Sequence, residues 1–398
     1  ICSLNEGEDR LTRSVIMEID SKGSVIGYRI VKSVINSKKK MTYESVNEYF
    51  YTNKVPNGYE PFIEDLNLMK ELSDILTRKR TNNGSIDFDS SEVSFVMEGS
   101  NVVDVDIKHQ DIAEKMIENF MIYANCTVAQ HVYYQDLPFA YRVHGIPSDI
   151  RLENTVKFLR TIGCKLEKVK NCENPAVIQN IIANLADKEN YPILSTFVLR
   201  AMQKAEYSVD NIGHYGLSEG YYTHFTSPIR RLTDLVVHML LDYYDNADNL
   251  LKTEVLIQLE EELKDICARA SMQERNAQKA EYQAYKLASV KLMEENIGRG
   301  YWVYISDINP SFITVKTEDL IEGIIPLKEI GLNYEYNYDQ KSIKLLDQNK
   351  VLLIGNKIHV NLYDVSDINE LTILVDAIKQ MEEYIIRKNN KQILSDDL

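Results

Sequence analysis

Residues 12–35 carry a two-residue hydrophobic alternation that predicts a β-hairpin. Val15, Met17 and Ile19 alternate with other residues, a Ser-Lys-Gly turn follows, and the alternation resumes at Val25. Two such segments divided by a glycine-containing turn are typical of an antiparallel strand pair.

From Thr42 onward the apolar spacing changes to three and four residues, which predicts helices. Tyr43, Val46, Tyr49 and Phe50 show this spacing at the start of the region. We expect further helices at 60–79, 110–130, 227–245 and 253–296, three more between 150 and 206, and a short strand pair at 86–88 and 94–97.

After residue 300 the pattern changes again, to short segments rich in Val, Ile and Tyr, which favour strands. Gly323, Gly331 and Gly355 separate some of these segments. Five or six short strands within about 80 residues predict a small barrel. The expected strands are 301–306, 312–316, 321–326, 343–346, 351–353, 357–363 and 371–375.

Composition agrees with a globular protein, since 44% of the 398 residues are hydrophobic and 26% are charged. The longest apolar runs, such as Leu235–Leu241, are far shorter than the roughly 18 residues needed to cross a bilayer. No basic-then-apolar leader is visible. We therefore expect a cytoplasmic protein without a membrane partner. The cysteines lack metal-ligand spacing and fit free thiols in a reducing compartment: Cys2, Cys126, Cys164, Cys172 and Cys267.

The formal net charge is −15, from 45 basic and 60 acidic residues. Such a charge favours solubility and argues against a protein that coats duplex DNA. It leaves open a nucleic-acid site within a cleft, because the local electrostatic field there decides whether nucleic acid binds.

The segment YTHFTSPIRR combines a helix start with an unusual charge pattern. Ser227 is a good N-cap and Pro228 suits the first helical position, so we expect a helix to begin at Ser227 with free N–H groups. Arg230 and Arg231 then lie in the first turn, where the helix dipole disfavours cations. A bound anion such as phosphate would explain them. The alternative is that one arginine pairs with Asp234.

These residues resemble a known family. YTHFTSPIRR-x-x-DL-x-x-H resembles the hallmark of the RNase II / RNase R family of exoribonucleases. His224 and the motif order make RNase R the closer match. Further motifs of the family occur in order: CSLN-x-x-x-DRL from Cys2, E-x-x-M-I-x-A-N from Glu118, R-x-H-x-x-P from Arg142 and a GHFGL-like GHYGL from Gly213.

The resemblance implies an α+β fold, with part of an RNB-type exoribonuclease catalytic domain followed by a small all-β OB-fold barrel that binds RNA. The expected boundaries are 1–245 for the C-terminal part of the catalytic domain, 246–297 for its helical extension, 298–378 for the OB fold and 379–398 for a charged tail.

The resemblance also implies an activity. Family members hydrolyse single-stranded RNA processively from the 3′ end to nucleoside 5′-monophosphates, and four aspartates hold the Mg²⁺ ions. In the family those aspartates lie upstream of the CSL segment. We therefore expect them to precede Ile1, so that this chain contains no metal ligands and is inactive alone. It would be a fragment, or one product of a split gene whose partner is the N-terminal part of the enzyme.

Asp104 and Asp106, followed by His109 and Asp111, are an alternative carboxylate pair for a metal. They come just before a predicted helix, where the family has a polar connector. Solvated turn residues are the better interpretation.

Several RNA contacts are implied residue by residue. Arg230 resembles the arginine that grips the scissile phosphate and is the expected catalytic residue, with Arg231 as a second phosphate contact. Tyr43 resembles a tyrosine that contacts the terminal nucleotides. Glu118 resembles a glutamate that hydrogen-bonds a ribose hydroxyl. Such a contact would help to distinguish RNA from DNA, since only RNA has the 2′-OH. Tyr43 alternatively belongs to the core of an amphipathic helix.

Four more residues complete the expected RNA-binding set. Phe88 resembles one jaw of an aromatic clamp, although a strand phenylalanine is more often core. Glu274 resembles a glutamate near the active-site exit, although its pattern alone fits a solvated helix face. His224 either contacts RNA or supports the turn. Ser227 is expected to contact RNA at the predicted helix start.

Two functions from different classes remain open. The first is an exoribonuclease of the RNase R type whose aspartates lie elsewhere. The second is a non-catalytic RNA-binding protein that lost the metal site and kept the channel. Single-stranded RNA is the expected ligand in both. A third possibility, an unrelated protein with a chance motif, is disfavoured because the motifs occur in order.

Overall fold

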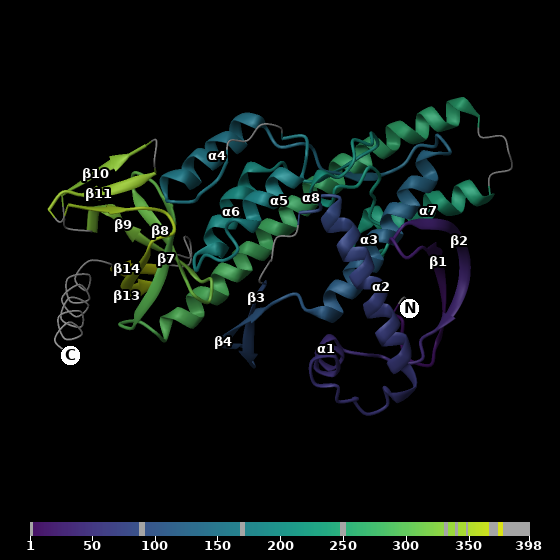
Figure 1. Cartoon of the computed structure of the whole chain (residues 1–398), viewed down its shortest axis with the longest axis horizontal. Helices are drawn as coiled ribbons and strands as arrows, with labels where there is room; N and C mark the ends of the chain where they lie inside the picture. The colour runs from purple at the N-terminus through teal and green to yellow at the C-terminus, as the bar shows by residue number, and fades with distance from the viewer. Residues whose placement is uncertain are drawn as a thin grey trace.

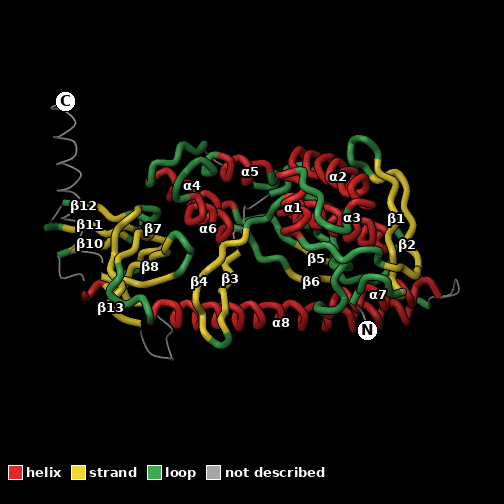
Figure 2. The backbone as a smooth tube through the Cα atoms, turned by 90° about the horizontal axis from the view of Figure 1, so that it is seen from below, coloured by secondary structure: helices red, strands yellow, loops and turns green. Residues whose placement is uncertain are grey.

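The structure is a computed structural model that describes residues 3–86, 92–167, 172–246, 252–329, 333–338, 341–347, 349–365 and 373–376. A helical body with a two-stranded hairpin at one end is joined to a β-barrel at the other end by one long helix (Figure 1). Seen from below, that helix runs beneath the whole body (Figure 2).

The body contains both helices and short strands. Its elements, in chain order, are β1 (Asp9–Ile19), β2 (Val25–Asn36), α1 (Tyr43–Thr52), η1 (Glu60–Phe62), α2 (Ile63–Asn82), β3 (Glu92–Glu98), β4 (Asn101–Lys108), α3 (Ile112–Tyr133), β5 (Tyr141–Val143), α4 (Asp149–Thr161), α5 (Ala176–Ala183), α6 (Tyr191–Ala201), β6 (Glu206–Ser208), η2 (Tyr215–Leu217) and α7 (Leu232–Asn246).

The rest of the described chain is one helix followed by strands. Its elements are α8 (Thr253–Glu294), β7 (Gly300–Ile308), β8 (Phe312–Thr317), β9 (Glu322–Pro326), η3 (Leu327–Glu329), β10 (Tyr334–Asn337), β11 (Ser342–Leu345), β12 (Lys350–Leu352), β13 (Lys357–Val365) and β14 (Ile373–Asp376).

The predicted hairpin at the start of the chain is confirmed as β1 paired antiparallel with β2. Asp20 Oδ1 closes its turn by accepting from the N–H groups of Lys22 and Ser24 at 2.9 and 2.7 Å. Val15 and Ile30 lie opposite each other and pack against the core formed by α3, β5, β6, α7 and α8. The hairpin is therefore anchored through one face.

Helices α1, α2 and α3 form from the predicted amphipathic segments. The Thr42 side chain accepts from Ser45 N and caps α1. The buried amide of Asn119 on α3 donates to Ser73 Oγ at 2.9 Å and to Thr77 Oγ1 at 2.8 Å, both on α2. A buried side-chain amide needs such partners, so this contact fixes how α2 and α3 pack.

Helix α8 connects the two ends of the molecule. It contains 42 residues, which corresponds to about 63 Å at 1.5 Å per residue. Near its start, Leu263 and Cys267 are buried with α3 and α7. Near its end, Val290 and Met293 enter the hydrophobic core of the barrel.

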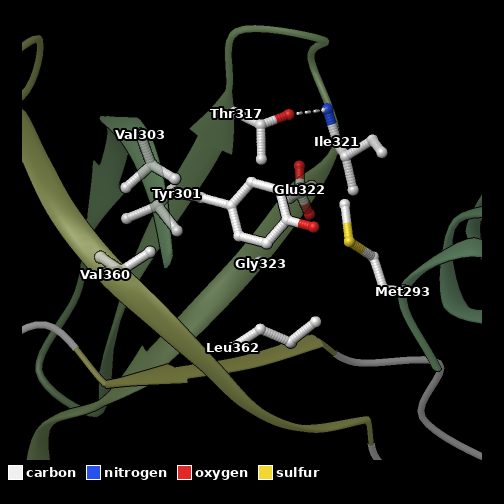
Figure 3. Close-up of a pocket in the computed structure, with 10 residues that line it drawn as sticks. Met293, Tyr301, Val303, Thr317, Ile321, Glu322, Gly323, Val360 and Leu362 are labelled. Atoms are coloured by element: carbon white, nitrogen blue, oxygen red, sulfur yellow. Dashed lines mark hydrogen bonds between the residues drawn. The ribbon is translucent and has the colours of Figure 1, made fainter. Parts of the chain in front are cut away.

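The predicted barrel is confirmed: its strands close in the order β13-β14-β9-β8-β7. Met293 of α8 lines the same small pocket as Tyr301, Ile321 and Leu362 at one end of the barrel (Figure 3). A separate three-stranded sheet, β10-β11-β12, extends from it. Strand β10 was not expected, and residues 379–398 lie outside the described part of the chain.

The barrel is also held by the loop between α5 and α6. Glu189 Oε1 accepts from Tyr304 Oη at 2.8 Å and from Lys357 Nζ at 2.6 Å. Asn190 Nδ2 donates to Gly355 O at 2.9 Å. Contacts at both the loop and the helix fix the barrel against the body.

The expected strand pair at 86–88 and 94–97 is corrected by the structure. Ile86 lies in a loop, and residues 87 and 88 fall outside the described chain. β3 pairs instead with β4, whose alternation follows a turn at Gly99. Among the described residues, no helix is both long enough and apolar enough to span a membrane.

We predict that Leu263→Ala lowers the free energy of unfolding by about 2–5 kcal/mol, because it leaves a cavity in a packed core. Leu263 is 1% exposed. Leu287→Ala on the same helix is the matched control, because Leu287 is 44% exposed and its loss should change the value by about 0.5 kcal/mol or less. Urea unfolding followed by circular dichroism measures both. Equal losses would contradict the described packing of α8.

Candidate nucleic-acid interface

Residues 221–227 cross the body outside any strand or helix. Arg142 N on β5 donates to Tyr222 O at 2.9 Å. Further along, Phe225 N donates to the buried Asn125 Oδ1 at 3.0 Å, and Asn125 Nδ2 donates to Tyr222 Oη at 3.2 Å. One amide of α3 therefore holds the segment at two points.

The helix after this segment begins later than expected. α7 starts at Leu232, and Ser227 is not its N-cap. The Ser227 N–H is taken by Asp234 Oδ2 at 2.7 Å. Residues 227–231 form a turn in which Ser227 O accepts from Arg230 N and Arg231 N at 3.3 and 3.2 Å. The expected helix start at Ser227 is wrong, because Asp234 of the next turn already accepts from the Ser227 N–H. A contact between Ser227 and RNA stays a prediction.

Two of the three arginines near this turn are paired. Arg231 Nη2 donates to Asp234 Oδ2 at 3.0 Å, and its Nε lies 2.9 Å from Oδ1. Arg142 holds both oxygens of Glu274 at 2.6 and 2.9 Å. Arg230 is exposed, and within the described residues no hydrogen bond or ion pair involves its guanidinium. The pairing alternative is therefore confirmed for Arg231.

His224 is held behind the turn. Its Nδ1 lies 2.8 Å from Tyr207 Oη, and its ring packs edge-on against Tyr207 and Tyr222. Burial lowers the pKa of His224 to about 2, helped by the charges of Arg231 and Arg142. His224 is thus neutral and supports the turn, while its contact with RNA stays a prediction.

His214 of the GHYGL motif and His144 of the R-x-H-x-x-P motif form a second pair of buried imidazoles, whose pKa values burial lowers. His144 Nδ1 accepts from Gly216 N at 3.1 Å, which leaves Nε2 to donate to Gln203 O at 2.9 Å. His214 Nδ1 accepts from Leu217 N at 3.2 Å, and burial lowers the pKa of His214 to about 3. A Cβ at Gly216 would lie 2.9 Å from His144 Nδ1, so the contact requires glycine there.

Glu118 and Tyr43 lie outside this network, on α3 and α1. Arg80 on α2 holds Glu118 Oε1 through Nη1 and Nη2 at 3.3 and 3.2 Å, and its Nη1 also donates to Asn119 Oδ1 at 2.7 Å. Tyr43 is 46% exposed, so the interpretation as a core residue is wrong. Phe88 falls outside the described residues.

The alternative carboxylate pair does not form a metal site. Asp104 Oδ1 accepts from Val105 N at 2.8 Å. Asp111 Oδ1 caps α3 by accepting from Ile112 N, and it also accepts from Tyr51 Oη. Across the described ranges, no three His, Cys, Asp or Glu side chains are grouped so that they could hold a metal. These residues therefore do not fit the Mg²⁺ that the resemblance implies.

The comparison with known proteins decides the family. A family profile described as "RNB domain" matches residues 1–245. The chain belongs to the RNase II / RNase R (RNB) family.

Relatives in this family are named Ribonuclease R. The protein from Thermotoga maritima is 36% identical over 359 residues, which cover 89% of this chain and 50% of that protein. Ribonuclease R 1 of Lactococcus lactis is 34% identical over 90% of this chain and 44% of its own length. This chain thus spans about half the length of the curated relatives it matches.

Solved structures confirm the expected fold class. Mycoplasma genitalium RNase R in complex with ribose methylated single-stranded RNA matches with a TM-score of 0.88 and 27% identity, over 95% of this chain and 59% of that one. The same enzyme in complex with double-stranded RNA matches with a TM-score of 0.81 and 25% identity.

Sequence reasoning missed the residues that hold the RNB motifs in place. Arg142 and Asn125 each stood in a quoted motif, but no role followed from the sequence for either of them. Their partners are far away in the chain: Arg142 and Glu274 are 132 residues apart, and Asn125 is 100 residues from Phe225. The available signal was a polar residue among apolar neighbours within each motif.

We predict that the free energy of unfolding falls as the pH drops from 7 to 5. The ordinary histidine pKa is 6.5, while His214 and His224 titrate at about 3 and about 2 when folded. Below pH 6.5 these histidines bind protons in the unfolded chain but stay neutral in the folded chain. Their contribution to the free energy of unfolding is therefore complete above pH 6.5 and is lost as the pH falls below it. At pH 5 the loss is about 2 kcal/mol per buried histidine.

Urea unfolding at the two pH values measures this loss. His224→Phe should lose less stability than the parent chain between pH 7 and 5. His109→Gln, at an exposed position, should keep the full pH dependence. An unchanged dependence in His224→Phe would show that this ring is not buried in its neutral form.

Proposed function

We propose that this chain acts in the 3′-to-5′ hydrolysis of single-stranded RNA, as part of a processive RNase R-type exoribonuclease that releases nucleoside 5′-monophosphates in the cytoplasm. The observation that carries the proposal is the exposed Arg230 guanidinium next to two arginines that are already paired. The family, the relatives named Ribonuclease R and the RNA-bound neighbour support RNA as the ligand. The described cysteines are free thiols, as a reducing compartment favours.

Charge balance directs phosphate to one position. Arg231 is neutralised by Asp234, and Arg142 by Glu274. His224 carries no charge at neutral pH. The remaining positive charge of the turn is that of Arg230, whose planar fork matches two phosphate oxygens.

The same fork suits the chemistry of phosphodiester hydrolysis. Negative charge grows on the phosphate oxygens as the bond breaks, and a fixed guanidinium stabilises it more in the transition state than in the ground state. The anchored turn fixes the backbone that carries Arg230. The resemblance to the family implies magnesium-binding aspartates upstream of the CSL segment, so we propose that they precede Ile1 and that this chain alone binds RNA without cutting it.

Glu118 is the proposed contact to a ribose hydroxyl. Arg80 engages Oε1 alone, and within the described residues no hydrogen bond reaches Oε2. The side chain is 33% exposed, so Oε2 remains available as an acceptor for a 2′-OH. Tyr43, exposed at the start of α1, is the proposed stacking partner of a terminal base.

Glu274 is proposed to act indirectly. Both of its oxygens are held by Arg142, whose guanidinium also lies 4.7 Å from the Tyr207 ring. Tyr207 in turn contacts His224. The pair therefore supports the turn from the side of α8, and Phe88 stays a proposed clamp residue.

We predict that Arg230→Ala weakens binding of a 5′-labelled single-stranded RNA about tenfold or more, because a charge-assisted bidentate contact is lost. Fluorescence anisotropy in EDTA, at several salt concentrations, measures the affinity and its salt slope. The slope should fall by about 0.7, as for one lost phosphate contact. Arg151→Ala, exposed on α4, is the control. Equal affinity of Arg230→Ala and the parent chain would contradict the proposed role.

Hydrolysis of the same RNA in Mg²⁺ and in EDTA tests the proposed location of the metal ligands. The expected result is retention of intact RNA in both. Laddered shortening from the 3′ end that needs Mg²⁺ and Arg230 would refute that location and establish nuclease activity. Absence of RNA binding by the parent chain would overturn the proposed function.

Intact RNA in Mg²⁺ also fits the non-catalytic alternative, so a second assay separates the two. The part of Thermotoga maritima Ribonuclease R that this chain does not span is added and checked for co-purification. Shortening by the complex that Arg230→Ala abolishes supports the exoribonuclease. A co-purified complex that retains RNA unchanged supports the RNA-binding protein.

A further inference from the structure

Asp234 is the most deeply buried carboxylate in the described chain. It is 0% exposed, and no other Asp or Glu among the described residues belongs to the buried group. A carboxylate is stable in such a place only when hydrogen bonds and an opposite charge compensate it. The partners of Asp234 therefore show what its burial accomplishes.

All of these partners belong to the turn at 227–231. Ser227 N donates to Oδ2 at 2.7 Å, and Arg231 Nη2 donates to the same oxygen at 3.0 Å. Arg231 Nε lies 2.9 Å from Oδ1. The first and last residues of the turn are thus tied to one carboxylate, which the first turn of α7 carries.

This arrangement separates two chemically identical neighbours. Arg231 is drawn against Asp234, with its side chain 24% exposed. Arg230, one residue earlier, is exposed and has no such partner among the described side chains. Because the turn is closed at both ends, the backbone that carries Arg230 has one fixed path.

We propose that Asp234 is a positioning residue for phosphate binding: it anchors the 227–231 turn, holds Arg231 back and thereby presents Arg230. The inference rests on the proposed function of Arg230. Asp234 itself touches no RNA.

A purely structural role makes a different prediction. If Asp234 only stabilised α7, its loss would lower the melting temperature and would reduce RNA affinity independently of Arg230. If it acts through Arg230, its effect on affinity disappears once Arg230 is gone. A double-mutant cycle measures this difference.

The cycle compares the parent chain, Asp234→Asn, Arg230→Ala and the double variant, by anisotropy with single-stranded RNA in EDTA. Asp234→Asn keeps the size of the side chain and one acceptor for Ser227 N–H, and it releases Arg231. We expect it to weaken RNA binding about fivefold or more. The double variant should bind within about twofold of Arg230→Ala.

Asp242→Asn is the matched control. Asp242 lies on the same helix, its side chain is 52% exposed, and it pairs with Lys32. Its substitution should leave RNA affinity within about twofold of the parent chain. Circular dichroism and melting temperature are recorded for every variant.

The outcomes separate the two proposals. If Arg230→Ala has no effect, the proposed function of Arg230 fails. If Arg230→Ala weakens binding while Asp234→Asn does not, or if the two effects add, the positioning role of Asp234 is overturned. Should Asp234→Asn fail to fold, Asp234→Glu replaces it, because it keeps the charge. We expect Asp234→Glu to fold and to bind RNA less tightly than the parent chain. In the Arg230→Ala background it should no longer change RNA affinity.

Discussion

The site depends on one constraint: residues 221–227 carry buried backbone groups that no sheet or helix pairs in full. Buried N–H and C=O groups require partners, and side chains supply several of them here. Asn125 and Asp234 accept from Phe225 N and Ser227 N, and the His238 ring, stacked on Phe225, bonds Phe225 O at 2.9 Å. The position of the turn is therefore set by α3 and α7 together, and it exists only when both helices are packed.

Electrostatics follows from the same packing. Burial keeps His214 and His224 neutral, so these rings add hydrogen-bonding geometry without adding charge. Arg142 and Arg231 form ion pairs with the carboxylates of Glu274 and Asp234. Removing one partner of such a buried pair is costly, because the other charge is then left without compensation. Of the three arginines near the turn, Arg230 is the one that no described side chain pairs.

Periodicity identified the elements that it directly controls. The hairpin, the helices and the barrel strands arise because one face of each segment is apolar. The predicted start of α7 was wrong because Ser227 and Pro228 have the local pattern of a helix start, whereas the Ser227 N–H donates to Asp234. β10 was missed although Tyr334 and Tyr336 alternate with polar residues, because a four-residue strand gives a weak pattern. Contacts such as Arg142 with Glu274 join distant positions, and no local pattern predicts them.

The continuous α8 also sets a length scale. Glu274, which supports the turn through Arg142, and Met293, which enters the barrel core, lie 19 residues apart on an unbroken helix, or about 29 Å. The loop at Glu189 and Asn190 secures the same barrel from a second side. Because α8 is one unbroken helix, the support of the turn and the core of the barrel are held at this spacing.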